Sequence, residues 1–212
     1  GFRGPDSCFY DVDNDVYLVS NIQGAPHAKD GNGYILKVSP DDGSRSQWIS
    51  GDQTGVTLHA PKGMAISGDV LWVADIDMLR KFNRNSGAPM GGVEIPGATF
   101  LNDVSAGPDG NIYCTDSGLD ENFEATGTDA IWQVTLSGQV TAVVKGTELG
   151  QPNGLDAQRG GIYVVSWRDG TFYQIDYRGV RTDLGKAPQG KLDGVVRVEI
   201  ETTAADGSQA LA

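Results

Sequence analysis

The sequence contains few of the side chains that bind soft metals. There are two His and two Cys in 212 residues, and none of them stands at the spacing of a zinc site. Cys8 and Cys114 each fall inside a strand-like run, so we interpret them as small buried hydrophobic residues and not as a disulfide framework. Cysteine usage leaves the compartment open, and we expect a periplasmic or secreted location before a cytoplasmic one.

Basic residues are also scarce. Lys and Arg number 16 against 28 Asp and Glu, which gives a formal net charge of -12. Nucleic acid is not expected as a partner, because phosphate binding needs a basic surface. No apolar run approaches the ~20 residues of a membrane span, so we expect no membrane partner either. A small molecule remains as the expected partner, and the sequence does not indicate an oligomeric state.

Glycine is abundant, with 30 residues, and a short motif occurs five times. In each copy one polar residue precedes a short apolar run. The copies are Gly4-Pro5-Asp6-Ser7, Ala60-Pro61-Lys62-Gly63-Met64, Phe100-Leu101-Asn102-Asp103-Val104, Gln151-Pro152-Asn153-Gly154-Leu155 and Lys191-Leu192-Asp193-Gly194-Val195. Successive copies lie about 40 to 56 residues apart, near the ~40–45 residues of a propeller blade.

Strand-like segments separated by turn residues follow the first four motifs. The predicted strands are Asp6–Tyr10, Val16–Asn21, Tyr34–Ser39 and Ser46–Ser50; Pro61–Ile66, Val70–Ala74, Leu79–Phe82 and Gly92–Ile95; Asn111–Thr115, Ile131–Leu136 and Val140–Val144 after the third motif; and Ile162–Ser166, Thr171–Asp176 and Val180–Asp183 after the fourth. Four antiparallel strands per repeat predict an all-β fold, a β-propeller with four full units and part of a fifth.

The two longest predicted loops are Ile22–Gly33 and Asp116–Ala130. Each joins the second strand of a unit to the third. In a propeller such a loop returns to the face on which the first strand begins, so we expect both loops beside the five polar residues, where they are candidates for a substrate lid.

The end of the chain breaks the pattern. Lys191–Val196 begins a fifth unit, but Arg197–Glu201 and then a small, polar tail follow in place of a second strand. We therefore assign residues 1–201 to a single propeller domain and residues 202–212 to a polar, weakly ordered C-terminal tail.

The five motifs, together with Tyr34-Ile35-Leu36-Lys37-Val38-Ser39 and Leu71-Trp72-Val73-Ala74-Asp75, resemble the family of senescence marker protein, gluconolactonase and luciferin-regenerating enzyme. The resemblance covers residues 1 to about 196. It implies a six-bladed propeller with one divalent cation at the mouth of the central channel. Each motif alone has low specificity, and their order and spacing carry the resemblance.

The resemblance also implies site residues. The family's metal ligands are an acidic residue in Gly-Pro-Glu, an Asn in Pro-Asn-Gly and an Asp in Asp-Gly, which match Asp6, Asn153 and Asp193. Asp6 departs from the usual Glu, since it keeps the charge but is one methylene shorter. A further family Asn, which contacts the substrate and a metal-bound water, matches Asn102.

The family propeller is longer than this chain. We expect about two blades of sequence to be missing between Val196 and Arg197, so that Arg197–Glu201 would correspond to the family's closing strand. A naturally smaller propeller is the alternative.

The residues themselves favour a hard cation. Asp6 and Asp193 offer carboxylates and Asn153 an amide carbonyl, which suits Ca²⁺ first, with Mg²⁺, Zn²⁺ or Mn²⁺ as alternatives. The competing interpretation is that these residues only cap the first strands by bonding nearby backbone.

Other polar residues near the motifs have open roles. Lys62 would bind an anionic substrate group or offset the carboxylates, and Asp103 would contact the substrate, support its neighbours or shape a turn. His27 and His59 are candidates for a proton shuttle, although solvated loop positions are the preferred interpretation.

Together these features predict a divalent-metal-dependent hydrolase of lactones or related esters. The cation would polarise the carbonyl and activate water. Asp193 would act as general base and Asn102 would orient the substrate, with Lys62 and Asp103 as further substrate contacts. The alternative is a non-catalytic propeller that binds a small ligand or a protein on the same face.

Overall fold

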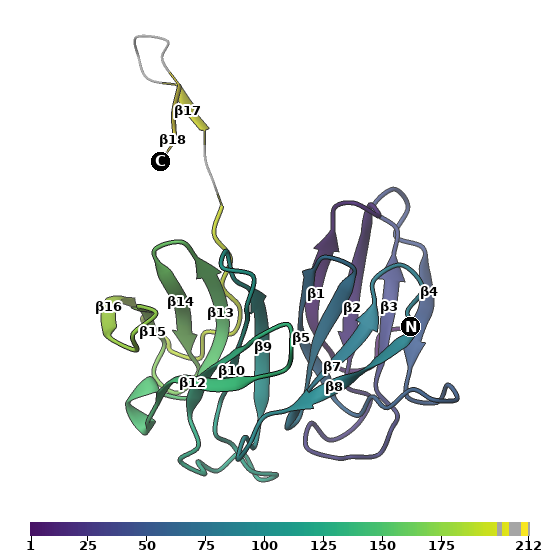
Figure 1. Ribbon diagram of the computed structural model, residues 1–212, viewed down its shortest axis with the longest axis horizontal. Helices are drawn as coiled ribbons and strands as arrows, with labels where there is room; N and C mark the ends of the chain where they lie inside the picture. Colours follow the sequence, from purple (N-terminus) through teal and green to yellow (C-terminus); the bar gives the residue numbers. More distant parts are fainter. Residues whose placement is uncertain (199–200, 204–208, 212) are drawn as a thin grey trace.

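The computed structural model describes residues 1–198, 201–203 and 209–211. Four sheets of four antiparallel strands form blades 1 to 4, each ordered from first strand to last (Figure 1). Their strands are β1 (Pro5–Asp11), β2 (Val16–Asn21), β3 (Tyr34–Val38) and β4 (Arg45–Ser50); β5 (Pro61–Ser67), β6 (Val70–Asp75), β7 (Met78–Asn83) and β8 (Pro89–Glu94); β9 (Leu101–Ala106), β10 (Ile112–Asp116), β11 (Ala130–Val134) and β12 (Val140–Lys145); and β13 (Pro152–Gln158), β14 (Gly161–Ser166), β15 (Thr171–Ile175) and β16 (Arg181–Lys186). The predicted all-β propeller with four full units is confirmed.

Short turns close the hairpins at one end of the blades. In the turn after β15, the Asp176 carboxylate accepts the N–H groups of Arg178 and Val180, both at 2.9 Å, and Gly179 supplies the positive φ of 88°. Several strands begin or end one to three residues from their predicted bounds, and the last strand of blade 2 is one of them. β8 begins at Pro89 and not at Gly92, because a register shift opposite Arg80–Phe82 lets Pro89 pair with Phe82.

The blades pack side by side through their faces, with the first strands β1, β5, β9 and β13 as successive neighbours around the axis. Apolar side chains of adjacent blades fill the space between them. Buried examples are Leu18, Ile35 and Phe82 between blades 1 and 2; Trp72, Leu101 and Trp132 between blades 2 and 3; and Tyr113, Leu155 and Tyr173 between blades 3 and 4. Removing this apolar area from water stabilises the arrangement of blades that positions the first strands.

The other end of the blades carries the long loops. Residues 22–33 and 117–129 join the second and third strands of blades 1 and 3, at the end where β1 and β9 begin (Figure 1, lower edge). We call this end the mouth. A 3-10 turn, η1 (Thr147–Leu149), precedes β13 there. The loops therefore lie beside the five motifs, as the topology predicts.

The fifth motif does not form a strand. Residues 187–198 contain no strand, but the segment runs beside β13, where the N–H of Gly154 donates to the carbonyl of Asp193 at 2.7 Å and the N–H of Arg197 donates to Asp156 at 3.0 Å. The segment thus lies along the exposed side of the last blade's first strand.

Arg197–Glu201 falls partly outside the described residues, at 199–200. Glu201 belongs to β17 (Glu201–Thr203), which pairs with β18 (Gln209–Leu211) in a two-stranded sheet. The missing-blade interpretation therefore stays a prediction. Among the described residues, no helix is long and apolar enough to cross a membrane.

Candidate functional site

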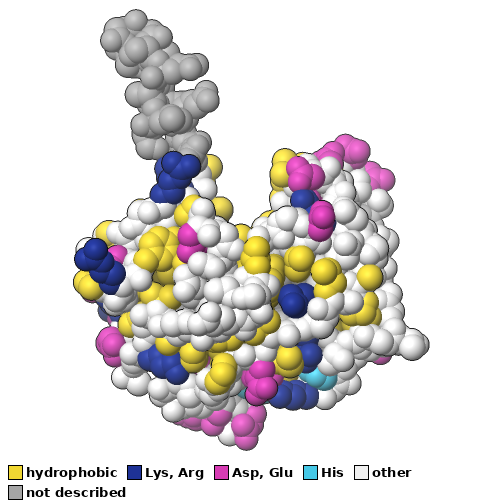
Figure 2. Space-filling view, in the orientation of Figure 1, with side chains coloured by type: hydrophobic (Ala, Val, Ile, Leu, Met, Phe, Trp, Pro, Cys, Tyr) yellow, Lys and Arg dark blue, Asp and Glu magenta, His cyan; other side chains and the backbone are white. Residues whose placement is uncertain are grey.

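A cavity of about 580 Å³ lies between the first strands of the four blades and the segment after β16. Its polar lining comes from separate repeats and includes Asp6, Asn102, Asp103, Asn153 and Asp193, besides Ser7, Ser105 and Asp156. Apolar side chains, among them Phe9, Met64 and Leu155, line the rest. Figure 2 shows the surface hollowed at its upper edge, between the half of the molecule that holds blades 1 and 2 and the half that holds blades 3 and 4. Four of the five polar motif residues are thus gathered at one cavity, together with Asp103.

Asp6 is open to the water of the cavity, yet protein surrounds its carboxylate closely. Burial raises the pKa of Asp6 to about 6; the Lys62 ammonium opposes this shift and the Asp193 carboxylate adds to it. A carboxylate that is poorly solvated and faces another carboxylate is stabilised by an added cation. A cation at the cavity would therefore offset the cost of burying the Asp6 carboxylate, and the cation itself stays a prediction.

The donor set fits a hard cation in its chemistry, with the Asp6 and Asp193 carboxylates and the Asn153 amide all lining one cavity. In the described part of the chain, however, no three His, Cys, Asp or Glu side chains are close enough together to hold a metal ion. The predicted ligand set contains only two residues of these types, Asp6 and Asp193, with Asn153 as the third ligand, so the metal site stays a prediction.

Lys62 is the motif residue that does not line the cavity. Its side chain is buried, and Nζ donates to the carbonyls of Ala60 at 3.1 Å and Pro26 at 3.3 Å and lies 4.3 Å from the centre of the Phe100 ring. Burial lowers the pKa of Lys62 to about 8, against the attraction of the Asp6 and Asp75 carboxylates. Of its two expected roles, this placement favours charge compensation over substrate binding.

Asp103 joins three first strands at the cavity wall. Its carboxylate accepts the N–H of Val104 in β9 at 2.8 Å and the N–H of Leu155 in β13 at 3.0 Å. A Cβ on Gly63 of β5 would lie 2.1 Å from Asp103 Oδ1, so only glycine fits there. Burial raises the pKa of Asp103 to about 7, and Asp6 and Asp193 add to the shift. Asp103 therefore supports the wall that carries the predicted site residues.

Two buried hydroxyls of blade 3 hold the predicted asparagines, and the sequence reasoning missed both. Thr115 Oγ1 donates to the main-chain carbonyl of Asn153 at 2.6 Å and accepts the main-chain N–H of Asp103 at 3.1 Å. Ser117 Oγ donates to the Pro152 carbonyl at 2.7 Å and accepts the Asn102 side-chain amide at 3.1 Å. A sequence signal exists, since the two hydroxyl residues flank Asp116 at alternate positions and so point to the same side.

The last residue of each second strand ties the chain just before its own first strand. Asn21 Oδ1 accepts the N–H of Arg3. The fully buried carboxylates of Asp75 and Asp116 accept N–H groups of residues 59–60 and 99–100, and the Ser166 hydroxyl donates to the carbonyl of residue 150. We call these four side chains the latches. They fix where the first strands begin, and hence where the motif residues sit.

The two mouth loops contact each other away from the cavity. His27 bonds through Nε2 with the carbonyl of Leu119 at 3.2 Å, and its ring lies 4.5 Å from Phe100 and 5.6 Å from Phe123. His59 Nδ1 accepts the N–H of Gly31 at 3.0 Å. Neither imidazole lines the 580 Å³ cavity, so both placements favour structural roles over the proton shuttle.

No protein-family model matches this chain, and no curated protein matches it. Solved structures do. A candidate gluconolactonase is 19% identical, with a TM-score of 0.66 over 99% of this chain and 77% of that one. A catalytically inactive virginiamycin B lyase from Staphylococcus aureus with quinupristin is 14% identical, with a TM-score of 0.63 over 98% of this chain and 69% of that one. A nidogen/laminin complex is 15% identical, with a TM-score of 0.56 over 90% of this chain and 83% of that one. The chain thus has the β-propeller fold. Of these three similar structures, two are named for enzymes, a gluconolactonase and a lyase, and the third is a protein–protein complex.

Proposed function

We propose that this protein is a divalent-metal-dependent hydrolase of lactones or related esters that works at the mouth cavity. One observation carries the proposal: Asp6, Asn102, Asn153 and Asp193, from four separate repeats, line a single cavity with oxygen-bearing side chains. The likeness in fold to a candidate gluconolactonase supports the substrate class.

In this proposal Asp6, Asn153 and Asp193 hold the cation, with Ca²⁺ preferred and Mg²⁺, Zn²⁺ or Mn²⁺ as alternatives. When bound, the cation polarises the substrate carbonyl and lowers the pKa of water. Asp193 is exposed to the cavity and takes the proton of the attacking water. Asn102 orients the substrate, and the apolar wall around Phe9 and Leu155 accommodates the carbon skeleton.

Calorimetric titration with Ca²⁺, combined with hydrolysis assays on a panel of lactones, tests the proposal. Asp193→Asn and Asn153→Ala should each weaken Ca²⁺ binding by about tenfold or more. Asp103→Asn should weaken it less, because Asp103 bonds backbone N–H groups and not the cation. Equal losses in all three variants would show that the ligand set is wrong. Lactone turnover that Ca²⁺ does not stimulate would contradict the hydrolase.

A non-catalytic propeller that binds a ligand or a protein at the same face is the second candidate. The observation in its favour is the likeness in fold to a nidogen/laminin complex. Calcium binding without turnover of any lactone in the panel would favour this candidate, whereas Ca²⁺-stimulated turnover excludes it as the main function.

A further inference from the structure

The Asn102 side chain stands at the end of a short hydrogen-bond chain that crosses from blade 3 to blade 4. Its amide bonds with Ser117 Oγ at 3.1 Å, and Ser117 Oγ bonds with the Pro152 carbonyl at 2.7 Å. Ser117 is fully buried, so water does not replace either partner. Pro152 directly precedes Asn153, and the chain therefore links the two asparagines of the proposed site.

Counting protons along this chain fixes its direction. The Pro152 carbonyl can only accept, so the single hydroxyl proton of Ser117 points to it. Ser117 Oγ is then left with lone pairs and can only accept from Asn102. The atom of Asn102 that faces Ser117 must therefore be the amide nitrogen, which settles an orientation that side-chain shape alone does not determine.

The carbonyl oxygen of Asn102 is turned away from Ser117 as a result. Among the described residues, no group donates a hydrogen bond to Asn102 Oδ1, while the side chain lines the cavity. We infer that Ser117 is a positioning residue: by accepting the Asn102 amide, it turns Asn102 so that its carbonyl oxygen faces the cavity as a hydrogen-bond or cation acceptor.

This orientation limits the roles that the Asn102 side chain can have in the proposed function. The inference rests on that proposed function in one respect, because it takes the cavity as the ligand site. An acceptor oxygen binds a cation, a water proton or a substrate hydroxyl. It does not stabilise the negative oxygen of a tetrahedral intermediate, which needs N–H donors. The Asn102 carbonyl oxygen therefore belongs with the Asp6 and Asp193 carboxylates on the electron-rich side of the cavity, and the group that this oxygen touches is a cation or a hydrogen-bond donor.

Side-chain amide NMR on ¹⁵N-labelled protein tests the orientation without any ligand. The Asn102 pair is assigned by its absence in Asn102→Ala. In the unmodified protein, its protons should show nuclear Overhauser contacts to the Ser117 β-protons, and one of them should exchange slowly. Absence of these contacts would overturn the inference, and this measurement needs no Ser117 variant to fold.

Ser117→Ala should shift the Asn102 amide pair and speed its exchange. Ser20→Ala is the matched control, since it removes another fully buried serine whose hydroxyl donates to a backbone carbonyl, that of Ser7 in blade 1. The control should leave the Asn102 pair in place. An Asn102 pair that moves equally in both variants, or in neither, would contradict a specific role for Ser117.

Affinity for Tb³⁺, a luminescent stand-in for Ca²⁺, gives a second readout through a double-mutant cycle. Ser117→Ala should weaken binding several-fold in the unmodified background and should have no further effect in Asn102→Ala, because it acts through Asn102. Equal losses in both backgrounds would refute the positioning role. If no variant and no unmodified protein binds Tb³⁺, the proposed metal site fails, and the NMR result still decides the orientation of Asn102.

Discussion

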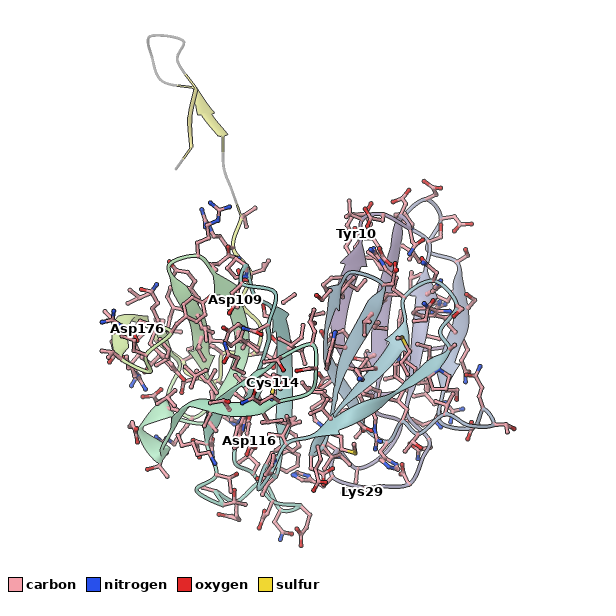
Figure 3. The ribbon with its side chains drawn as sticks, in the orientation of Figure 1. Tyr10, Lys29, Asp109, Cys114, Asp116 and Asp176 are labelled. Carbon is pink, nitrogen blue, oxygen red and sulfur yellow. The ribbon has the colours of Figure 1, made fainter. Side chains whose placement is uncertain are left out.

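Aspartates at the two ends of the blades experience opposite environments. At the turn end, hydrogen bonds hold the pKa of two carboxyls below its usual value. Asp109 is exposed, and the Tyr113 hydroxyl and the N–H of Asn111 donate to it against the effect of burial. Asp176 is half-buried and accepts the N–H groups of Val180 and Arg178. At the mouth, burial raises the pKa of Asp6, Asp103 and Asp116. Figure 3 labels both kinds, with Asp109 and Asp176 above Asp116.

The opposite pKa shifts show that aspartate has two different effects on the stability of this fold. A carboxylate that stays solvated while it accepts N–H groups favours the folded state, whereas a desolvated carboxylate opposes it until a proton or a cation neutralises it. The turn aspartates therefore contribute to the hairpins. The aspartates of the cavity impose a free-energy cost that a bound cation would offset.

The largest effect should follow from removing a buried latch. Asp75→Ala leaves the partly buried Arg80, whose Nε lies 2.8 Å from Asp75 Oδ2, without its partner, together with the N–H groups of His59 and Ala60. We expect a loss of about 3–5 kcal/mol in the free energy of unfolding, measured by urea denaturation. Asp183→Ala breaks the exposed ion pair with Arg181 and should cost less than about 1 kcal/mol. Similar losses in the two variants would contradict a distinct role for the latch.

A smaller effect is expected where β13 touches the segment of the fifth motif. A Cβ on Gly154 would lie 2.6 Å from the Asp193 carbonyl and 2.8 Å from the backbone of Gly194, so Gly154→Ala must push this segment outward. We expect a loss of about 1–3 kcal/mol in stability and weaker Ca²⁺ binding, because Asp193 moves. Gly185→Ala in the same blade meets no atom within 4 Å and should change neither quantity. Unchanged Ca²⁺ binding in Gly154→Ala would remove Asp193 from the ligand set.

The smallest effects are changes in the pH dependence of stability, and they should have opposite signs. The raised pKa of Asp116 means that the folded state holds this proton above pH ~4, so its contribution to stability declines as the pH rises from there. The lowered pKa of Asp109 adds stability above pH ~4 that is lost as the pH falls. In Asp116→Asn, the free energy of unfolding should rise more steeply between pH ~4 and neutrality than in the unmodified protein. In Asp109→Asn, the free energy of unfolding should fall less steeply as the pH drops below ~4. Profiles that change in the same direction would contradict the comparison.

The sequence predicted the blades and most of the cavity because both depend on register. Asp6, Asn102 and Asn153 occupy the same place in three repeats, and a repeat that keeps its register places that position at the same depth along the axis. Asp193 also reaches the cavity, but in a segment without a strand, because no second strand follows to pair with it among residues 187–198.

The direction of Lys62 and the roles of Thr115 and Ser117 could not be predicted in the same way. Lys62 is held by Pro26 and Phe100, which come from segments distant in sequence. Hydroxyl residues at the end of a strand are common, and only the contact between blades 3 and 4 shows that these two bond the chain at Pro152 and Asn153. Such contacts depend on how blades pack, which the pattern within one repeat does not contain.

The latches also bear on how the chain folds. Each one closes a loop of 15 to 18 residues within its own blade, although the side chain that closes it differs, being Asn21, Asp75, Asp116 or Ser166. Closing so short a loop carries a small entropic penalty, and the hairpin that follows is equally local. We therefore expect each blade to acquire its own shape early, and we expect the docking of preformed blades onto one another to be the slow step. In such a sequence of events the cavity, whose wall needs all four blades, is the last part of the molecule to form.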